Sequence, residues 1–283
     1  MTMLYGNDER HQLAKYMSTP TSSFTELLAE HHPGALPWSH ASSGQPGSAM
    51  PHGTTIITLR FADGIVMAGD RQVTSGTTIA YRYGEKVYAA DNSSVVGVAG
   101  TAALAFEMAK LFQVELLHYE KIEGVELSLQ GKANKLAGMV RGNLEMAMQG
   151  LTVVPLYAGY DADSSIGRIY SYDPAGGLTE EFKGYHSIGS GSIFALGSLK
   201  KLHDVGLDEQ AAVTVALEAL YDAAEGDTAT MGPDLARGIY PIVHVVTADG
   251  GRALTDAETE TFARGIVERR QSAPDGPRAI IES

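Results

Sequence analysis

The sequence contains no cysteine, which excludes a disulfide framework, thiolate metal sites and a cysteine nucleophile. A chain without thiols also fits a reducing compartment. Basic residues are scarce: 21 of them face 34 acidic residues, for a formal net charge of −13. Because nucleic-acid phosphates are bound by a basic face, we expect no nucleic acid partner.

Long apolar runs are missing as well. No segment reaches the roughly 18 consecutive apolar residues that span a bilayer, so we expect no membrane partner. The N-terminal stretch MTMLYGNDERHQLAKYM carries acidic residues early and no basic run leading into an apolar core, unlike a signal peptide. We therefore expect a cytoplasmic location.

Several catalytic signatures are also absent. The sequence has no Walker A loop, no GxSxG elbow and no HExxH motif. The pair His31-His32 has no partner at metal-ligand spacing, which favours two solvated side chains over a metal site. We expect neither a metal nor an organic cofactor.

Residues 1–53 differ in composition from the rest of the chain. They hold five of the nine histidines and five of the eleven prolines. The stretch 40–53 is rich in Gly, Ser, Pro and His, which predicts a flexible linker. Before it, residues 22–32 carry a helix start signal, with Ser22 or Ser23 as the cap. Three apolar residues share one helical face: Phe24, Leu27 and Leu28. We interpret this zone as an appendage with one docking helix.

The whole chain has enough residues for one large domain or two small ones, and 44% of it is hydrophobic. Short β-branched runs broken by glycine predict strands at 54–61, 64–70, 86–90, 94–100, 153–161, 167–174, 185–191 and 238–249. Helical spacing of apolar residues predicts helices at 101–121, 127–149, 191–204, 208–224 and about 256–269. Grouped strands and grouped helices indicate an α+β fold with sheets between helix pairs. We expect the polar tail, residues 269–283, to be disordered.

The junction Gly53-Thr54 is the most informative point of the sequence. A strand that starts with threonine is common, because threonine favours strands. Alternatively, cleavage before Thr54 would expose an α-amine with a pKa near 8, which can act as the general base for the threonine hydroxyl. Gly53 has no side chain to block the approach of that hydroxyl to its carbonyl.

Such a nucleophile needs a nearby cation, a carboxylate that orients the cation, and N–H groups aimed at an oxyanion. Asp70, Lys86 and the turn at Gly100 supply these groups in chain order. Each residue also has a purely structural interpretation. Asp70 could close a turn, Lys86 could be a solvated charge at a strand edge, and Gly100 could only form a turn. The GSGS motif at 189–192 could bind phosphate at a helix N-terminus or form only a tight turn.

Taken together, residues 54–250 resemble the β subunit of the proteasome core particle. The motifs that carry the resemblance are G-TTI (53–56), AGDRQVT (68–74), YGEKV (83–87), GVAGTAA (97–103), SIGSGS (187–192) and GDTAT (226–230). With Thr54 counted as first, Asp70 is seventeenth, Lys86 thirty-third and Gly100 forty-seventh, as in the family pattern. The appendage looks like the propeptide of actinobacterial β subunits.

The resemblance implies a threonine endopeptidase with the N-terminal nucleophile hydrolase fold, a four-layer α-β-β-α sandwich. It implies autocatalytic removal of residues 1–53, which leaves 283 − 53 = 230 residues, and a catalytic domain over 54–268. It further implies homo-heptameric β rings, α-subunit rings, an ATP-dependent unfoldase ring and tagged protein substrates.

The family pattern also assigns roles to single residues. Thr54 would be the nucleophile and, through its α-amine, the base of a reaction that passes through an acyl-enzyme. Lys86 would hold down the pKa of the hydroxyl, Asp70 would pair with Lys86, and the Gly100 N–H would form the oxyanion hole.

A second group would order the N-terminus and a bridging water, with Ser190 and Asp227 as its members. Thr230 stands where the family often has serine. The family's usual R-D-A-Y-S is G-D-T-A-T here, so this match departs from the pattern. Two neighbouring acids, Asp222 and Glu225, are rivals for the carboxylate position.

The first specificity pocket of the family would be lined by Val73, Val98 and Ala102. These side chains are small and apolar, which predicts cleavage after hydrophobic residues.

Three other interpretations remain at this point. A simpler bacterial two-ring peptidase shares the Thr-Thr-Ile start and the Asp and Lys positions, but it lacks a long prosegment and an extended C-terminal region. A non-catalytic scaffold, such as an α-type or degenerate β subunit, would have lost the Gly-Thr junction, the lysine or the aspartate. Without the resemblance, a binding module with a processed arm would also fit.

Overall fold

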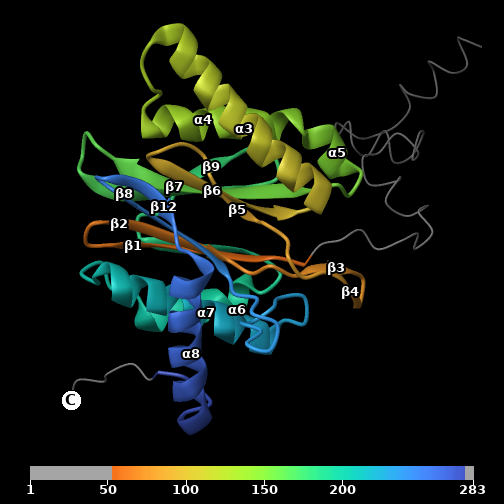
Figure 1. The fold of residues 1–283 in the computed structure, drawn as a ribbon. Helices are drawn as coiled ribbons and strands as arrows, with labels where there is room; N and C mark the ends of the chain where they lie inside the picture. The colour runs from red at the N-terminus through yellow and green to blue at the C-terminus, as the bar shows by residue number, and fades with distance from the viewer. Residues whose placement is uncertain (1–52, 278–283) are drawn as a thin grey trace, which may run out of the picture. The chain divides into compact units, whose positions relative to one another are not determined.

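The computed structural model describes residues 53–277. The helix predicted within residues 22–32 and the linker up to residue 52 lie outside the described residues. Within the described part, two five-stranded antiparallel sheets stack face to face, and helices cover their outer faces (Figure 1). The predicted α-β-β-α sandwich is therefore confirmed.

The first sheet has the strand order β10-β1-β2-β11-β12. Its strands are β1 (Thr55–Phe61), β2 (Gly64–Gly69), β10 (Tyr185–Gly189), β11 (Ile242–Thr247) and β12 (Gly250–Ala253). Strands β1 and β2 are joined by a tight turn, and nearly every residue in them is buried. Strand β2 is a continuous apolar run, as expected for a strand covered on both faces, whereas β1 also contains Thr55, Thr58 and Arg60.

The second sheet has the order β5-β6-β7-β8-β9. Its strands are β5 (Val87–Ala89), β6 (Ser94–Gly100), β7 (Val153–Asp161), β8 (Ile166–Tyr172) and β9 (Leu178–Glu180). A separate small hairpin consists of β3 (Val73–Ser75) and β4 (Thr78–Tyr81). Apolar side chains from both sheets fill the space between them: Ile56, Ile65, Met67, Val95, Leu156 and Ile169.

Helices α3 (Ala102–Glu123) and α4 (Leu129–Gly142) pack on the second sheet, through apolar side chains such as Phe112 and Leu136. Helices α6 (Ser192–Leu202) and α7 (Glu209–Gly226) pack on the first sheet, as Figure 1 shows. The short helix α5 (Leu144–Met148) follows α4, and α8 (Asp256–Ser272) ends the described chain. No helix within residues 53–277 is long and apolar enough to cross a lipid bilayer.

Some elements differ from the sequence prediction. The single helix predicted over 127–149 is two helices, because Asn143 caps α4 and bonds back to it. Strands β3, β4, β9 and β12 were not predicted. Each is only three or four residues long, too short to display a period of two.

The disordered tail was predicted to begin at residue 269. This start is wrong, because α8 continues to Ser272. Arg270 is only 5% exposed. Its guanidinium bonds to Glu218 at 2.7 and 3.0 Å and to Asp222 at 2.6 Å, all on α7. Its Nη1 also donates to the Pro274 carbonyl. A buried arginine requires such pairing, so residues 269–272 belong to the folded body. Residues 278–283 lie outside the described part.

Candidate active site

Gly53 and Thr54 lie directly before β1, and both are buried. The Thr54 hydroxyl donates a hydrogen bond to the Gly53 carbonyl oxygen at 2.6 Å. The Thr54 carbonyl in turn accepts from the Ser190 backbone N–H at 2.9 Å. The hydroxyl is thus held against the peptide bond that precedes it.

No side chain fits at residue 53. A Cβ placed on Gly53 would lie 2.5 Å from Thr74 Oγ1 and 2.7 Å from the Ala229 backbone oxygen. The second contact is with backbone, which cannot move aside as a flexible side chain could. Glycine is therefore required for this close approach of the chain.

Asp70 returns to the start of β1 because β2 runs antiparallel beside it, with Ile56 opposite Gly69. Its backbone N–H donates to the Thr55 carbonyl, and its Oδ1 accepts the Thr55 N–H at 2.8 Å. Its Oδ2 accepts the N–H groups of Gln72 at 2.8 Å and Met231 at 3.3 Å. The carboxylate is fixed by the chain on three sides.

Lys86 lies one residue before β5, with its side chain 6% exposed. Its Nζ donates to Asp70 Oδ1 at 2.7 Å, to the Gly53 carbonyl at 2.9 Å and to the Gln72 carbonyl at 2.5 Å. An ammonium has three donors, so all of them are used. One of the three is directed at the carbonyl oxygen of the Gly53-Thr54 peptide bond.

Burial shifts the pKa values of this ion pair. It lowers the pKa of Lys86, although the carboxylate of Asp70 and the more distant Asp227 oppose that shift. Burial also raises the pKa of Asp70, against the effect of the Lys86 ammonium and the N–H groups of Thr55 and Gln72. The lysine therefore releases a proton more readily than a solvated lysine does.

Gly100 ends β6 with a φ of +117° and leads through Thr101 into α3. A Cβ at this position would lie 2.1 Å from the Thr152 carbonyl oxygen. Both the conformation and the close contact demand glycine. The turn brings the N-terminus of α3, with its free N–H groups and positive dipole end, to the same cavity as Thr54.

A small cavity of about 30 Å³ connects these groups. Gly53, Thr54, Lys86 and Gly100 line it together with the three residues predicted for the specificity pocket: Val73, Val98 and Ala102. The structure thus brings all of them to one place.

Three further lining residues were not predicted: Glu85, Tyr88 and Ala105. Tyr88 could have been found, because it lies two residues after Lys86 and so faces the same side of β5. Its hydroxyl donates to the main-chain carbonyl of Glu85 at 2.5 Å, and burial raises the pKa of Tyr88 to about 12. The tyrosine is therefore neutral near pH 7. Glu85, by contrast with the buried Tyr88, is exposed to solvent.

A second polar group adjoins the threonine. Asp227 Oδ2 accepts hydrogen bonds from Ser190 Oγ at 2.6 Å and from Thr230 Oγ1 at 2.7 Å. Burial favours a higher pKa for Asp227, but these bonds and that of the Ala229 N–H together lower it. Ser190 Oγ also lies 3.4 Å from the Thr54 carbonyl oxygen, so this group extends to the candidate nucleophile.

The two rival acids lie elsewhere. Asp222 Oδ1 binds Arg270 Nη2 at 2.6 Å, and Glu225 lies 3.9 Å from Arg270 Nη1. Both therefore face α8, and Asp227 is the carboxylate beside Ser190. The GSGS motif forms the turn from β10 into α6, in agreement with its interpretation as a tight turn.

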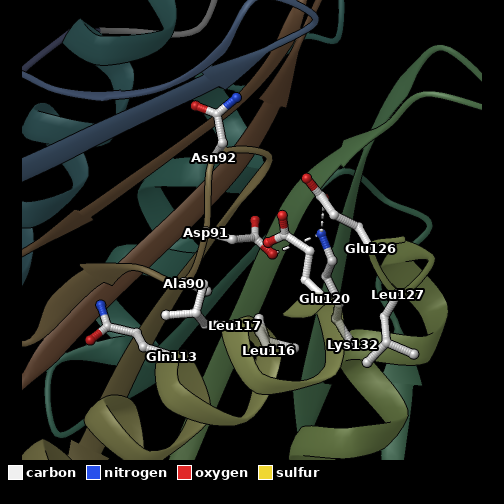
Figure 2. Close-up of a pocket in the computed structure, with 10 residues that line it drawn as sticks. All are labelled: Ala90, Asp91, Asn92, Gln113, Leu116, Leu117, Glu120, Glu126, Leu127 and Lys132. Carbon is white, nitrogen blue, oxygen red and sulfur yellow. Dashed lines mark hydrogen bonds and ion pairs between the residues drawn. The ribbon is translucent and has the colours of Figure 1, made fainter. Parts of the chain in front are cut away.

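A larger cavity, about 380 Å³, lies elsewhere, between the β5–β6 turn, α3 and α4 (Figure 2). Lys132 is buried beside it and pairs with Asp91 at 2.7 Å and Glu126 at 2.9 Å, as the dashed lines in Figure 2 mark. Its third donor binds Ser93 Oγ at 3.0 Å. The α3 residues of this cavity begin at Gln113, about three turns from the helix start. None of the predicted site residues lines it.

Within residues 53–277, no cluster of three or more His, Asp or Glu side chains could hold a metal ion. The groups gathered at Thr54 are instead a hydroxyl, a buried ammonium, two carboxylates and backbone N–H groups. These are the components of nucleophilic catalysis with an oxyanion hole.

Comparison with known proteins agrees with this chemistry. A family model described as "Proteasome subunit" matches residues 50–233. A protein named proteasome subunit beta from Streptomyces griseus subsp. griseus is 54% identical over 269 residues, which cover 95% of each chain. Proteins of the same name from Stackebrandtia nassauensis and Frankia alni are 52% and 53% identical over 93% of this chain and 96% of their own. The chain therefore belongs to the proteasome subunit family, and within it to the β subunits, which are the threonine peptidases of the proteasome core particle.

Proposed function

We propose that Thr54 is the nucleophile of this peptidase, first in cutting its own chain after Gly53 and then in cutting substrates. The observation that carries the proposal is the convergence of two donors on one oxygen. The Gly53 carbonyl accepts the Thr54 hydroxyl at 2.6 Å and Lys86 Nζ at 2.9 Å.

In self-cleavage, Thr54 Oγ1 attacks the Gly53 carbonyl carbon, and the Lys86 ammonium stabilises the negative charge that develops on the carbonyl oxygen. The C–N bond then breaks, and the hydroxyl proton ends on the departing Thr54 nitrogen. The product is an ester between Gly53 and Thr54 with a free α-amine. Water hydrolyses this ester and releases residues 1–53.

In the mature enzyme the freed α-amine acts as the base for the Thr54 hydroxyl. Asp70 holds Lys86, whose positive charge lowers the pKa of the hydroxyl and of the amine. The Gly100 N–H, at the turn between β6 and α3, binds the substrate oxyanion. Ser190, Asp227 and Thr230 order the new N-terminus. Hydrolysis of the acyl-enzyme by water then completes each cycle.

The test is the intact mass and N-terminal sequence of this chain after co-expression with its cognate α subunit. We expect a chain of 230 residues, 283 − 53, that starts at Thr54 and an assembled particle that hydrolyses peptides. An assembled particle whose β chain still starts at Met1 and that is inactive would contradict the proposal.

We further propose cleavage after apolar residues. Val73, Val98, Ala102 and Ala105 give the cavity an apolar lining, while the side chain of Glu85 is exposed to solvent. A lysine or arginine side chain would lose hydration against this apolar lining, and an ion pair with the solvent-exposed Glu85 would offset little of that cost. On a panel of peptides that differ only in the residue before the cut, we expect kcat/KM to be at least about tenfold higher for leucine or tyrosine than for arginine. Faster cleavage after arginine would overturn this expectation.

Members of this family assemble with α subunits in rings. Beyond that, we propose two stacked homo-heptameric β rings between α rings, a cytoplasmic location, and delivery of tagged proteins by an ATP-dependent unfoldase ring. The last step is needed because this chain has no phosphate-binding loop with which to drive unfolding itself. The high identity to β subunits over 93–95% of the chain supports this arrangement over the simpler two-ring peptidase.

A further inference from the structure

Thr55 follows the candidate nucleophile and is fully buried. Its backbone engages Asp70 twice: the Thr55 N–H donates to Asp70 Oδ1 at 2.8 Å, and the Thr55 carbonyl accepts the Asp70 N–H at 3.1 Å. The backbone of Thr55 is therefore hydrogen-bonded to the carboxylate partner of Lys86.

The side chain of Thr55 reaches in the other direction. Its Oγ1 lies 2.5 Å from Thr230 Oγ1 and accepts the Gly191 N–H at 3.1 Å. Both contacts are buried, and they join β1 to the start of α6 and to the loop after α7.

The hydrogen-bond direction follows from counting protons. Each hydroxyl has one proton to donate. Thr230 donates its proton to Asp227 Oδ2 at 2.7 Å, where a carboxylate can only accept. Thr55 must therefore donate to Thr230, and its own oxygen is free to accept from Gly191. The chain of donors runs from Gly191 through Thr55 and Thr230 to Asp227, which also accepts from Ser190.

We infer that Thr55 is a positioning residue for catalysis, whose hydroxyl aligns the Ser190–Asp227–Thr230 group with the Asp70–Lys86 pair on either side of Thr54. This inference rests on the proposed function of Thr54. The backbone of Thr55 anchors one group and its hydroxyl anchors the other, so a small rotation of either group relative to the nucleophile would break a buried hydrogen bond. Misplacement of catalytic groups lowers the rate of the chemical step more than it weakens substrate binding.

The test uses the assembled particle with Thr55→Val, which keeps the side-chain shape and removes the hydroxyl, and Thr55→Ser, which keeps the hydroxyl. Thr58→Val is the matched control, because Thr58 is a fully buried threonine on the same strand whose hydroxyl donates to the Val66 carbonyl at 3.0 Å, away from the candidate site. For peptide hydrolysis we expect kcat of Thr55→Val to fall about tenfold or more, with KM within about twofold of the wild type. Thr55→Ser and Thr58→Val should stay within about threefold of wild-type kcat.

A double variant tests the contact itself. If the Thr55 hydroxyl acts through Thr230, then Thr55→Val in a Thr230→Val background should cause little additional loss. Equal kcat for Thr55→Val and Thr58→Val would overturn the inference, as would fully multiplicative losses in the double variant. If valine crowds the Gly191 N–H and prevents assembly, Thr55→Ala replaces it, because alanine removes the hydroxyl without adding bulk. The changes in kcat and KM expected for Thr55→Ala are the same as for Thr55→Val.

Failure of this inference is distinguishable from failure of the proposed function. Thr54→Ala reports on the nucleophile alone. An inactive Thr54→Ala variant beside a fully active Thr55→Val variant would retain Thr54 as the nucleophile and reject the positioning role of Thr55.

Discussion

Thr54→Ala is expected to leave residues 1–53 attached and to reduce peptide hydrolysis by at least about 10⁴-fold, because the variant has no side-chain oxygen for either reaction. The change removes a buried hydroxyl that, within residues 53–277, hydrogen-bonds the preceding carbonyl and no other group. We therefore expect assembly with the α subunit to persist. Intact mass measures the attachment of the first 53 residues, and a fluorogenic peptide measures hydrolysis.

Thr54→Ser is the matched control for this variant. Serine keeps the hydroxyl and, after cleavage, the α-amine, so processing and measurable hydrolysis should both remain. An alanine variant that still matures to a chain starting at residue 54 would show that another protease, not Thr54, removes the appendage. The role of the hydroxyl in self-cleavage would then have to be withdrawn, whereas its role in substrate hydrolysis would depend on the measured activity.

Lys86→Met is expected to have the second-largest effect, a loss of about 10³-fold or more in hydrolysis together with blocked or strongly slowed processing. The methionine retains most of the side-chain volume but removes the ammonium that binds the Gly53 carbonyl at 2.9 Å and Asp70 at 2.7 Å. Without this cation, the buried Asp70 carboxylate keeps its backbone N–H donors but has no counter-charge. We expect the free energy of unfolding to fall by about 3–5 kcal/mol.

Two controls separate catalysis from stability for Lys86. Lys132→Met removes another buried lysine, one that pairs with Asp91 and Glu126 away from the candidate site, and should lower stability while the activity per assembled particle stays near that of the wild type. The pair Lys86→Met with Asp70→Asn removes both charges and should recover part of the stability without recovering hydrolysis. Near-normal activity of Lys86→Met in assembled particles would refute the assigned role.

The patterns in the sequence predicted an α+β fold with sheets between helix pairs, most of its longer elements and the candidate residues Thr54, Asp70, Lys86 and Gly100, and the family resemblance implied the four-layer sandwich. The patterns could do so because strands of six or more residues and helices of three or more turns repeat their apolar pattern often enough to be recognised. The spacing of the four residues along the chain is likewise a property of the sequence, and it is what carries the resemblance to proteasome β subunits.

Only the tertiary structure decided between Asp222, Glu225 and Asp227, because the three acids lie close together in sequence and differ in what they face. Arg270, about fifty residues further along the chain, pairs with Asp222 and lies near Glu225. The contacts of Arg270 also hold the last turn of α8, which was predicted to be part of the tail.

The positioning contact of Thr55 likewise became visible only in the folded chain, since its partner Thr230 is 175 residues away. Local patterns encode which face of an element is buried. They do not encode which distant side chain meets a given hydroxyl or carboxylate, because that depends on how β1, α6, α7 and α8 pack together.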